Sequence, residues 1–425
     1  MRKIILSSLL VASVFQMNAQ VKELSEDRKA ALGKQPGDKV ITQIGTLELP
    51  APYASKSVAK VSKLVNWPEG TTPKAPEGFK VERFADGFKS PRWTYVAPNN
   101  DIFVVESDTK NSANRITILR DKDQDGVPDT RGIFMEDLNS PFGMLVIDNY
   151  FYVANTDGLY RYPYNEGDTK ITKKGEKLVG LPAGGYNNHW TRNIITKKDK
   201  SKIYISVGSA SNAGEYGMDK EVRRANILEV NLDGSGEKIY ASGIRNPVGM
   251  DWNPITGELW TAVNERDKLG NNLVPDYVTS VKEGGWYGWP YSYFGSIKDP
   301  RWEDDPHTDL VNAAIIPDVP VGPHTASLGF TFYNGKQFPE KYINGAFVGQ
   351  HGSWNRQPFS GYKVVFIPFE NGKPGQPEDF LTGFIADDAN EEVYGRPVGV
   401  TTLPDGSLLV NDDDSGIVWR VSVQN

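Results

Sequence analysis

A pattern of two short β-forming runs joined by a turn recurs six times and limits the possible folds more than any other feature. The turn often carries Gly or Asn, and the second run is rich in Val, Ile, Phe or Trp. The units begin at Pro91, Pro141, His189, Asn246, Ala326 and Arg396, at intervals of 50, 48, 57, 80 and 70 residues. Short strands repeated in this way are typical of radial β-architectures. The sequence therefore predicts an all-β fold, a six-bladed β-propeller with loops of unequal length.

Polar side chains stand just before or at the first β-run of several units. If the units are blades, these positions meet at one mouth of the central channel. The residues concerned are Arg92, His189, Arg245, Asn246 and Arg396. The sequence thus predicts a site assembled from residues that lie far apart in the chain.

The composition agrees with one large turn-rich β domain, because Gly (42) and Pro (28) are frequent in the 425 residues. The net charge of −7 argues against nucleic acid as a partner, since phosphate binding needs a basic surface. The absence of cysteine excludes disulfides, Cys–zinc sites, thiol catalysis and a lipidated cysteine anchor.

The N-terminus is expected to be a signal peptide over residues 1–19, because two basic residues precede an apolar run too short to span a bilayer as a helix. A secreted or periplasmic protein without membrane insertion follows from this prediction. Residues 20–78 are predicted as a lead-in, with a short helix ended by Gly33. The propeller is assigned to residues 79–425, with a long insert at about 267–324.

His189 is the sharpest candidate for chemistry among the four histidines of the chain. An imidazole is the side chain whose unperturbed pKa lies nearest neutral pH, so His189 could act as a general base. The alternative is a histidine that is hydrogen-bonded for structural reasons.

Arginines gather at comparable points of the repeats, and a guanidinium is well suited to bidentate recognition of carboxylates. A ring formed by Arg92, Arg192, Arg245 and Arg396, with Asn246, would suit a ligand that carries several carboxylates. The alternative is a set of arginines that pair with acids between blades.

Two segments could bind a hard cation such as Ca²⁺ through oxygen ligands. The first contains Glu265 and Asp267, and the second contains Asp121, Asp123 and Asp125. The second resembles an EF-hand loop but has Gly132 where the twelfth-position Glu would stand. Exposed polar turns are the alternative for both.

Aromatic and basic residues follow the second run of the fifth unit, where His351, Trp354 and Arg356 lie within a few residues of one another. The insert adds Trp286, Tyr287, Trp289, Tyr291 and Tyr293. Aromatic rings beside a polar pocket suit stacking on sugars or on a planar cofactor, and a packed corner is the alternative. P-loop, Rossmann, G-x-S-x-G and H-E-x-x-H motifs are absent from the sequence.

The segments HWTRN, IRNPVGMDW, GGWYGWPY, HTASLGFTFY, HGSWNR and GRPVGV resemble the sorbosone dehydrogenase group of pyrroloquinoline-quinone-dependent sugar dehydrogenases. They are more distantly similar to soluble glucose dehydrogenase. The resemblance covers about residues 65–423 and implies a quinone in the central funnel of a six-bladed propeller, with Ca²⁺ against it.

The resemblance also implies roles for particular residues. His189 matches the catalytic base, Arg245 and Asn246 match a pair that grips the quinone, and Arg396 matches a further quinone arginine. The backbone carbonyls of Glu265 and Arg266 fall where the glucose enzyme holds its calcium.

Three positions depart from the glucose enzyme. Val398 stands in place of a second arginine, no lysine stands near His351-Gly352, and Ser209 falls where an acid supports the base. His351, Arg356 and Arg92 are candidates to compensate for the missing cations.

The expected function is oxidation of a sugar or sugar aldehyde by proton abstraction and hydride transfer to the quinone, with electrons passed to a soluble or membrane acceptor. A calcium-dependent lactone hydrolase and a non-catalytic carbohydrate-binding propeller are the alternatives.

Overall fold

The computed structural model describes residues 23–110, 112–123 and 125–424, so the expected signal peptide lies outside the described residues. Strands dominate the described residues, and helices are few and short. Six sheets in this part of the chain have four or five strands each. Strands adjacent in a sheet run antiparallel, except that β20 joins β16 in parallel. The all-β prediction is therefore confirmed.

The first three sheets follow one another in chain order. Sheet one contains β5 (Pro91–Val96), β6 (Ile102–Glu106), β7 (Arg115–Arg120) and β8 (Thr130–Met135). Sheet two contains β9 (Met144–Ile147), β10 (Tyr150–Asn155), β11 (Gly158–Pro163) and β12 (Glu176–Gly180). Sheet three contains β13 (Ile194–Thr196), β14 (Ile203–Val207), β15 (Asn226–Val230), β16 (Lys238–Ser242) and β20 (Gly285–Trp286).

The other three sheets complete the set. Sheet four contains β17 (Pro247–Trp252), β18 (Leu259–Val263), β19 (Pro275–Val281) and β23 (Val319–Pro323). Sheet five contains β24 (Ser327–Phe332), β25 (Ala346–Gln350), β26 (Lys363–Ile367) and β29 (Glu378–Leu381). Sheet six contains β32 (Pro397–Thr402), β33 (Leu408–Asp412), β34 (Ile417–Val423) and β4 (Phe79–Ala85).

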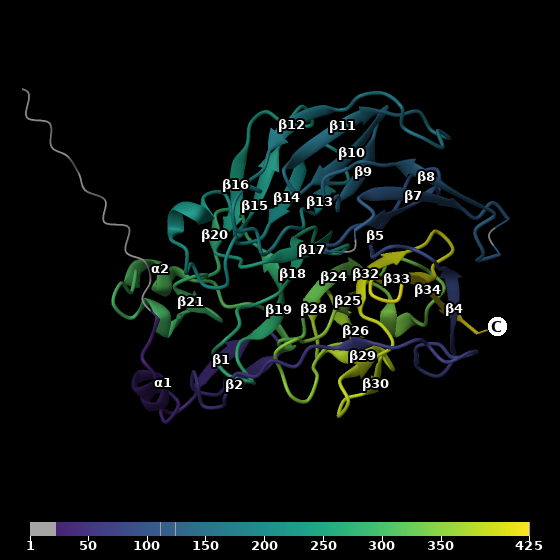
Figure 1. The fold of residues 1–425 in the computed structure, drawn as a ribbon. Helices are drawn as coiled ribbons and strands as arrows, with labels where there is room; N and C mark the ends of the chain where they lie inside the picture. The colour runs from purple at the N-terminus through teal and green to yellow at the C-terminus, as the bar shows by residue number, and fades with distance from the viewer. Residues whose placement is uncertain (1–22, 111, 124, 425) are drawn as a thin grey trace, which may run out of the picture.

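The segment predicted as an insert, residues 267–324, supplies strands to two of the sheets. It contributes β19 and β23 to sheet four and β20 to sheet three. The pairing of sheet six joins the two ends of the repeats, since Val421 of β34 lies opposite Val81 of β4. Figure 1 shows these two strands side by side, one from each end of the colour scale.

The first strands of the sheets lie next to one another in the order β9, β13, β17, β24, β32 and β5. The Tyr95 hydroxyl on β5 accepts a hydrogen bond of 3.0 Å from the Val146 backbone N–H on β9, which links the two ends of this series. The starts of all six sheets are thus brought together, as the predicted site requires.

The second strands β6, β14, β18, β25 and β33 are buried along their whole length. Strands covered on both faces read as continuous apolar runs, which explains why these segments do not alternate. Aromatic rings fill the space between sheets one and two, where Phe103 of β6 and Phe151 of β10 have ring centroids 4.9 Å apart. The core therefore lies between neighbouring sheets.

The N-terminal segment packs against the sheets. It contains α1 (Glu26–Leu32), which ends at Gly33 as predicted, and the hairpin of β1 (Asp38–Thr42) and β2 (Gly45–Leu49). The small remaining elements are β3 (Lys63–Leu64), β21 (Ser292–Tyr293), β22 (Ile297–Lys298), β27 (Phe369–Glu370), β28 (Lys373–Pro374), β30 (Ile385–Asp387), β31 (Glu392–Val393), α2 (Thr308–Ala313), η1 (Met218–Glu221), η2 (Pro300–Trp302) and η3 (Glu340–Tyr342). No helix among the described residues is long and apolar enough to cross a membrane.

Candidate active site

A polar pocket lies where the first strands begin. Seven residues singled out in the sequence line it together, namely Arg92, His189, Asn246, Asp267, His351, Trp354 and Arg396. Asn246 and Arg396 directly precede β17 and β32, and His351 directly follows β25. The convergence of distant repeat positions on one pocket is therefore observed.

His189 is held in a defined protonation state. Its Nδ1 lies 2.9 Å from the Ser209 carbonyl oxygen, which only accepts hydrogen bonds, so Nδ1 carries the proton. Nε2 is then a lone-pair acceptor, and the Asn188 amide donates to it at 3.3 Å. Burial, followed by the positive charge of Arg245, lowers the pKa of His189 well below its usual value. The imidazole is thus neutral at pH 7, as a proton acceptor must be.

Buried polar groups fix the segments around His189. The Arg192 guanidinium donates 2.8 Å bonds to the carbonyls of His189 and Thr191. On the Ser209 side, the Glu221 carboxylate accepts from the Ala210 and Ser211 backbone N–H groups at 2.7 and 3.0 Å. Arg192 therefore supports the loop of the histidine and does not line the pocket.

Gly208 allows a close approach between the third and fourth sheets. A Cβ at this position would lie 2.3 Å from Asn246 Oδ1 and 2.6 Å from the His189 Cβ. Because only glycine leaves this space, residue 208 determines how closely Asn246 and His189 pack.

Arg245 lies beneath the pocket and is almost completely buried. Its guanidinium donates to the carbonyls of Asn264 and Glu265 at 3.0 and 2.7 Å, and to both oxygens of Asn212. Arg245 thus ties the loop after β18 to the loop after β14. The Glu265 carbonyl, one of the predicted calcium ligands, is one of its acceptors.

Asp267 carries an anionic charge in the wall of the pocket. Burial opposes this charge, but hydrogen bonds from His324 and Asn355 and the charge of Arg245 lower the pKa of Asp267 to about 2. The Asn355 amide donates to Oδ1 at 2.8 Å, and His324 Nδ1 lies 3.2 Å from the same oxygen. Asn188, Asn264, His324 and Asn355 also line the pocket and are not predicted from the sequence, although the family-like segments contain His324 and Asn355.

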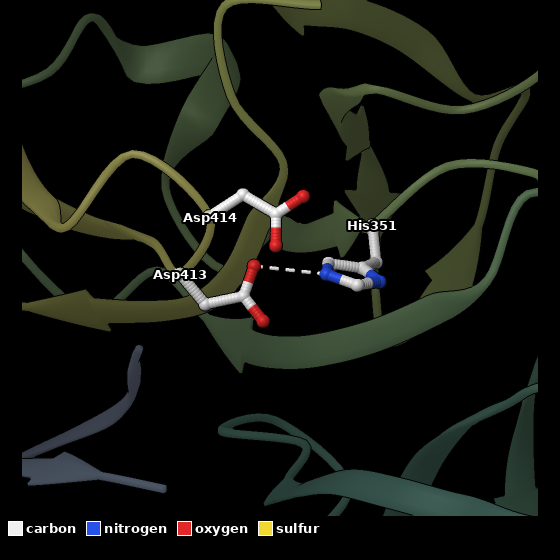
Figure 2. Close-up of side chains that lie close together, drawn as sticks. All are labelled: His351, Asp413 and Asp414. Carbon is white, nitrogen blue, oxygen red and sulfur yellow. Dashed lines mark hydrogen bonds and ion pairs between the residues drawn. The ribbon is translucent and has the colours of Figure 1, made fainter. Parts of the chain in front are cut away.

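A second charged group stands on another side of the pocket, where β25 and β33 end and β32 begins. His351 Nε2 donates to Asp413 Oδ1 at 2.8 Å, and Asp414 lies beside this pair (Figure 2). Burial and the charge of Arg396 lower the pKa of His351 to about 4. Arg92 pairs with the other Asp413 oxygen, and Arg396 donates to the carbonyls of His351 and Gly352 at 2.9 Å each. The single N–H of the neutral His351 is thus committed to Asp413, and Arg92 and Arg396 supply the donors at this side.

Other predicted residues lie away from the pocket. The Glu265 carboxyl and Arg266 are buried, and the Arg266 guanidinium pairs with Asp299 and donates to the Asp267 carbonyl. Arg356 donates to Pro358 and Asn272 at its own loop. Val398 packs in the apolar core, so no polar group replaces the second arginine there.

The remaining predicted features are also outside the pocket. Asp121, Asp123 and Asp125 belong to the connection between β7 and β8, where their carboxylates accept bonds from the Gly126, Asp125 and Val127 backbone N–H groups. The insert aromatics pack a corner, where Tyr291 stacks on His307 with centroids 3.9 Å apart.

Comparison with known proteins places this fold and site in context. Residues 73–285 and 304–424 match the TrAA12-like family, and the chain belongs to that family. A Borreliella burgdorferi protein described as uncharacterized is 31% identical over 365 residues, which is 83% of this chain and 91% of that protein.

Solved structures share the fold. The holo form of the pyranose dehydrogenase PQQ domain from Coprinopsis cinerea has a TM-score of 0.68 at 21% identity and covers 84% of this chain and 100% of that domain. The calcium structure of the Trichoderma reesei Carbohydrate-Active Enzymes Family AA12 protein has a TM-score of 0.71 at 18% identity and covers 83% of this chain and 97% of that one. The chain spans about half the length of the complete Coprinopsis enzyme, 54%, at 23% identity.

Proposed function

We propose that this protein is a quinoprotein dehydrogenase that oxidises a sugar or sugar aldehyde, with His189 as the general base. The observation that carries this proposal is the protonation state of His189, whose Nδ1–H is committed to the Ser209 carbonyl while Nε2 is unprotonated. The sugar hydroxyl would take the place of the Asn188 amide at Nε2. The pyrroloquinoline quinone named for the Coprinopsis domain supports the choice of cofactor. We further propose that the six sheets are the blades of one propeller.

The donors of the pocket fit a planar anion with several carboxylates. Arg92 Nε and Asn246 Oδ1 are buried, and neither has a hydrogen-bond partner among the described residues. Arg92 and Arg396 would bind carboxylates, and Asn246 and His351 would orient the ring system. None of the side chains of Arg245, Arg192 and Arg356 lines the pocket. These three residues would therefore support the quinone site without contacting the cofactor.

Calcium would be held by the Asp267 carboxylate and the carbonyls of Glu265 and Arg266. Hard cations prefer such oxygen ligands, and Asp267 is ionised at pH 7. The ion would share the Glu265 carbonyl with Arg245, since a carbonyl oxygen has two lone pairs. The holo PQQ domain from Coprinopsis and the calcium structure of the Trichoderma protein support this cofactor pair.

In the reaction, the residues of the chain bind the sugar, orient it and move one proton. The Nε2 lone pair of His189 accepts the proton of the sugar hydroxyl. The Ser209 carbonyl, which accepts the Nδ1–H bond, stabilises the resulting imidazolium. The bound quinone supplies the hydride acceptor. Asp267 favours the same protonation electrostatically, because its negative charge raises the pKa of His189.

The hydrolase alternative has little support from the pocket. A calcium-dependent lactonase needs several acidic ligands around its ion, whereas Asp267 is the single carboxylate among the lining residues that the structure describes. Secretion or export to the periplasm, a sugar substrate, and transfer of electrons to a soluble or membrane acceptor complete the proposed function.

Reconstitution tests the proposal. The purified protein is titrated with pyrroloquinoline quinone and Ca²⁺, and the quinone absorbance is followed while a panel of sugars is added. Stoichiometric binding followed by bleaching with a sugar supports a dehydrogenase. Binding of sugars without any binding of quinone would instead identify a carbohydrate-binding propeller.

A further inference from the structure

A second hollow adjoins the wall of the pocket at Trp354 and Asn355, which line both spaces. It measures about 660 Å³, within the range of about 300–1,000 Å³ that is usual for small-molecule sites. Trp354 is 46% exposed, so its indole face is available between the two spaces. A ligand that reaches His189 can therefore continue past Trp354 into the hollow.

The N-terminal segment builds the outer wall of this hollow. Tyr53 donates its backbone N–H to the Leu269 carbonyl at 2.7 Å, and the Ser55 hydroxyl accepts from the Asn271 N–H at 2.9 Å. Lys60 donates its backbone N–H to the Trp354 carbonyl at 2.8 Å. The segment is thus fixed to both loops that line the pocket, on the side where Figure 1 shows α1 and the first hairpin.

The hollow is positively charged although the chain carries a net charge of −7. Lys56, Lys268 and Arg301 line it, and none of the three has a carboxylate within 4.0 Å among the residues that the structure describes. The two acidic residues of the lining both face Lys29, with Glu26 at 2.8 Å and Glu23 at 3.7 Å, and Arg266 pairs with Asp299. Three unpaired cations around one hollow favour an anionic ligand.

We propose that this hollow binds a carboxylate-bearing sugar unit, so that the substrate is an acidic saccharide. That the ligand is a sugar rests on the proposed function. The unit to be oxidised would lie at His189, the Trp354 ring would pack on the C–H face of the chain, and Lys56, Lys268 and Arg301 would bind the carboxylate of a further unit. The N-terminal segment thereby has a role in substrate choice.

Calorimetry on the protein without added cofactor tests the charge requirement directly. The probes are galacturonic acid trimer and its fully methyl-esterified form, which share one sugar chain and differ in the three carboxylate charges and the three ester methyl groups. We expect the acid to bind at least roughly tenfold more tightly than the ester, since three ion pairs of this exposure each contribute a few-fold. Added salt should remove most of this difference, because the cations are accessible to solvent.

Variants assign the effect to the hollow. The triple variant Lys56→Gln, Lys268→Gln, Arg301→Gln should bind the acid no better than the ester. A matched triple variant at exposed positions elsewhere, Lys173→Gln, Lys198→Gln, Lys336→Gln, makes the same charge change and should keep the preference. Trp354→Ala should weaken both probes by a similar factor.

Equal affinity for the acid and the ester in the unaltered protein, or equal losses in the two triple variants, would overturn the inference. A different outcome would contradict the proposed function while leaving the inference about the hollow intact. If charge-dependent binding is observed but no sugar reduces bound quinone, the hollow is a saccharide site and the dehydrogenase assignment is wrong.

Discussion

At the scale of single residues, the proposed chemistry depends on His189, whose surroundings leave Nε2 unprotonated, with the Asn188 amide as its hydrogen-bond donor. The Ser209 carbonyl fixes the tautomer, and burial with the Arg245 charge keeps the ring neutral. The acid position of the glucose enzyme is not needed for this arrangement, since a backbone carbonyl orients the imidazole in its place.

The pH dependence of activity follows from the lowered pKa of His189. An ordinary imidazole gains its proton near pH 6.5, and a base with a lower pKa stays deprotonated in more acidic solution. We expect the acidic limb of the kcat/KM profile to lie below pH 6.5. An acidic limb at or above that value would show that the base is a different group.

His351 provides a separate prediction on stability. Its pKa is about 4 in the folded protein and about 6.5 when unfolded, so the unfolded chain binds more protons between these values and folding weakens as the pH falls from 6.5 to 4. Protonation of His351 in the unfolded chain lowers the free energy of unfolding by about 3 kcal/mol over this range. His351→Gln should therefore lose less stability over this range in urea unfolding of the cofactor-free protein. Parallel losses in the two proteins would contradict the assignment.

At the scale of elements, the ends of strands position the site. His189, Asn246, His351 and Arg396 precede or follow buried strands, and the order of the repeats was enough to predict that such positions meet. Their roles were less predictable. Arg192 and Arg245 looked equivalent to Arg92 in the sequence, but they donate to loop carbonyls because burial leaves those carbonyls as their partners.

Other elements could not be predicted from periodicity. The segment 267–324 is predicted as an insert because it lies between the fourth and fifth repeat units. Periodicity does not reveal its strands, since β19 and β23 are far apart in the chain and β20 pairs with another sheet. The positions of Asn264 and His324 depend on these long-range pairings, so neither residue was singled out from the sequence. The family resemblance singles out His189 as the candidate base, and the structure shows which groups surround it.

Gly208 tests how closely the elements must pack. Gly208→Ala would place a Cβ 2.3 Å from Asn246 Oδ1 and so displace Asn246 or His189. A displacement of about 1 Å can cost about 10²-fold in turnover. Gly184→Ala is the matched control, because a Cβ there meets no atom within 4 Å. We expect kcat to fall in the first variant alone, and equal kcat values would exclude this packing constraint.

At the scale of the whole molecule, sheet six joins the beginning and the end of the repeats, and the pocket depends on the series of first strands that this pairing completes. The core is distributed between sheets, so a defect in sheet six should destabilise the molecule as a unit.

Trp419→Ala tests this cooperativity. Trp419 is fully buried on β34, and removing a large buried aromatic side chain typically costs about 3–5 kcal/mol. Trp354→Ala, at a largely exposed ring, should change the free energy of unfolding by much less. Unfolding monitored by fluorescence and by circular dichroism should give one coincident transition in both variants. Separate transitions would show that sheet six unfolds independently of the others.

The rate of quinone reduction in the reconstituted protein tests the central claim most directly. Rapid mixing with an oxidisable sugar measures this rate for the unaltered protein and for His189→Gln, each with bound pyrroloquinoline quinone. We expect that the variant still binds the quinone and reduces it about 10²–10⁴-fold more slowly. Equal rates in the two proteins would contradict the assignment of His189 as the base.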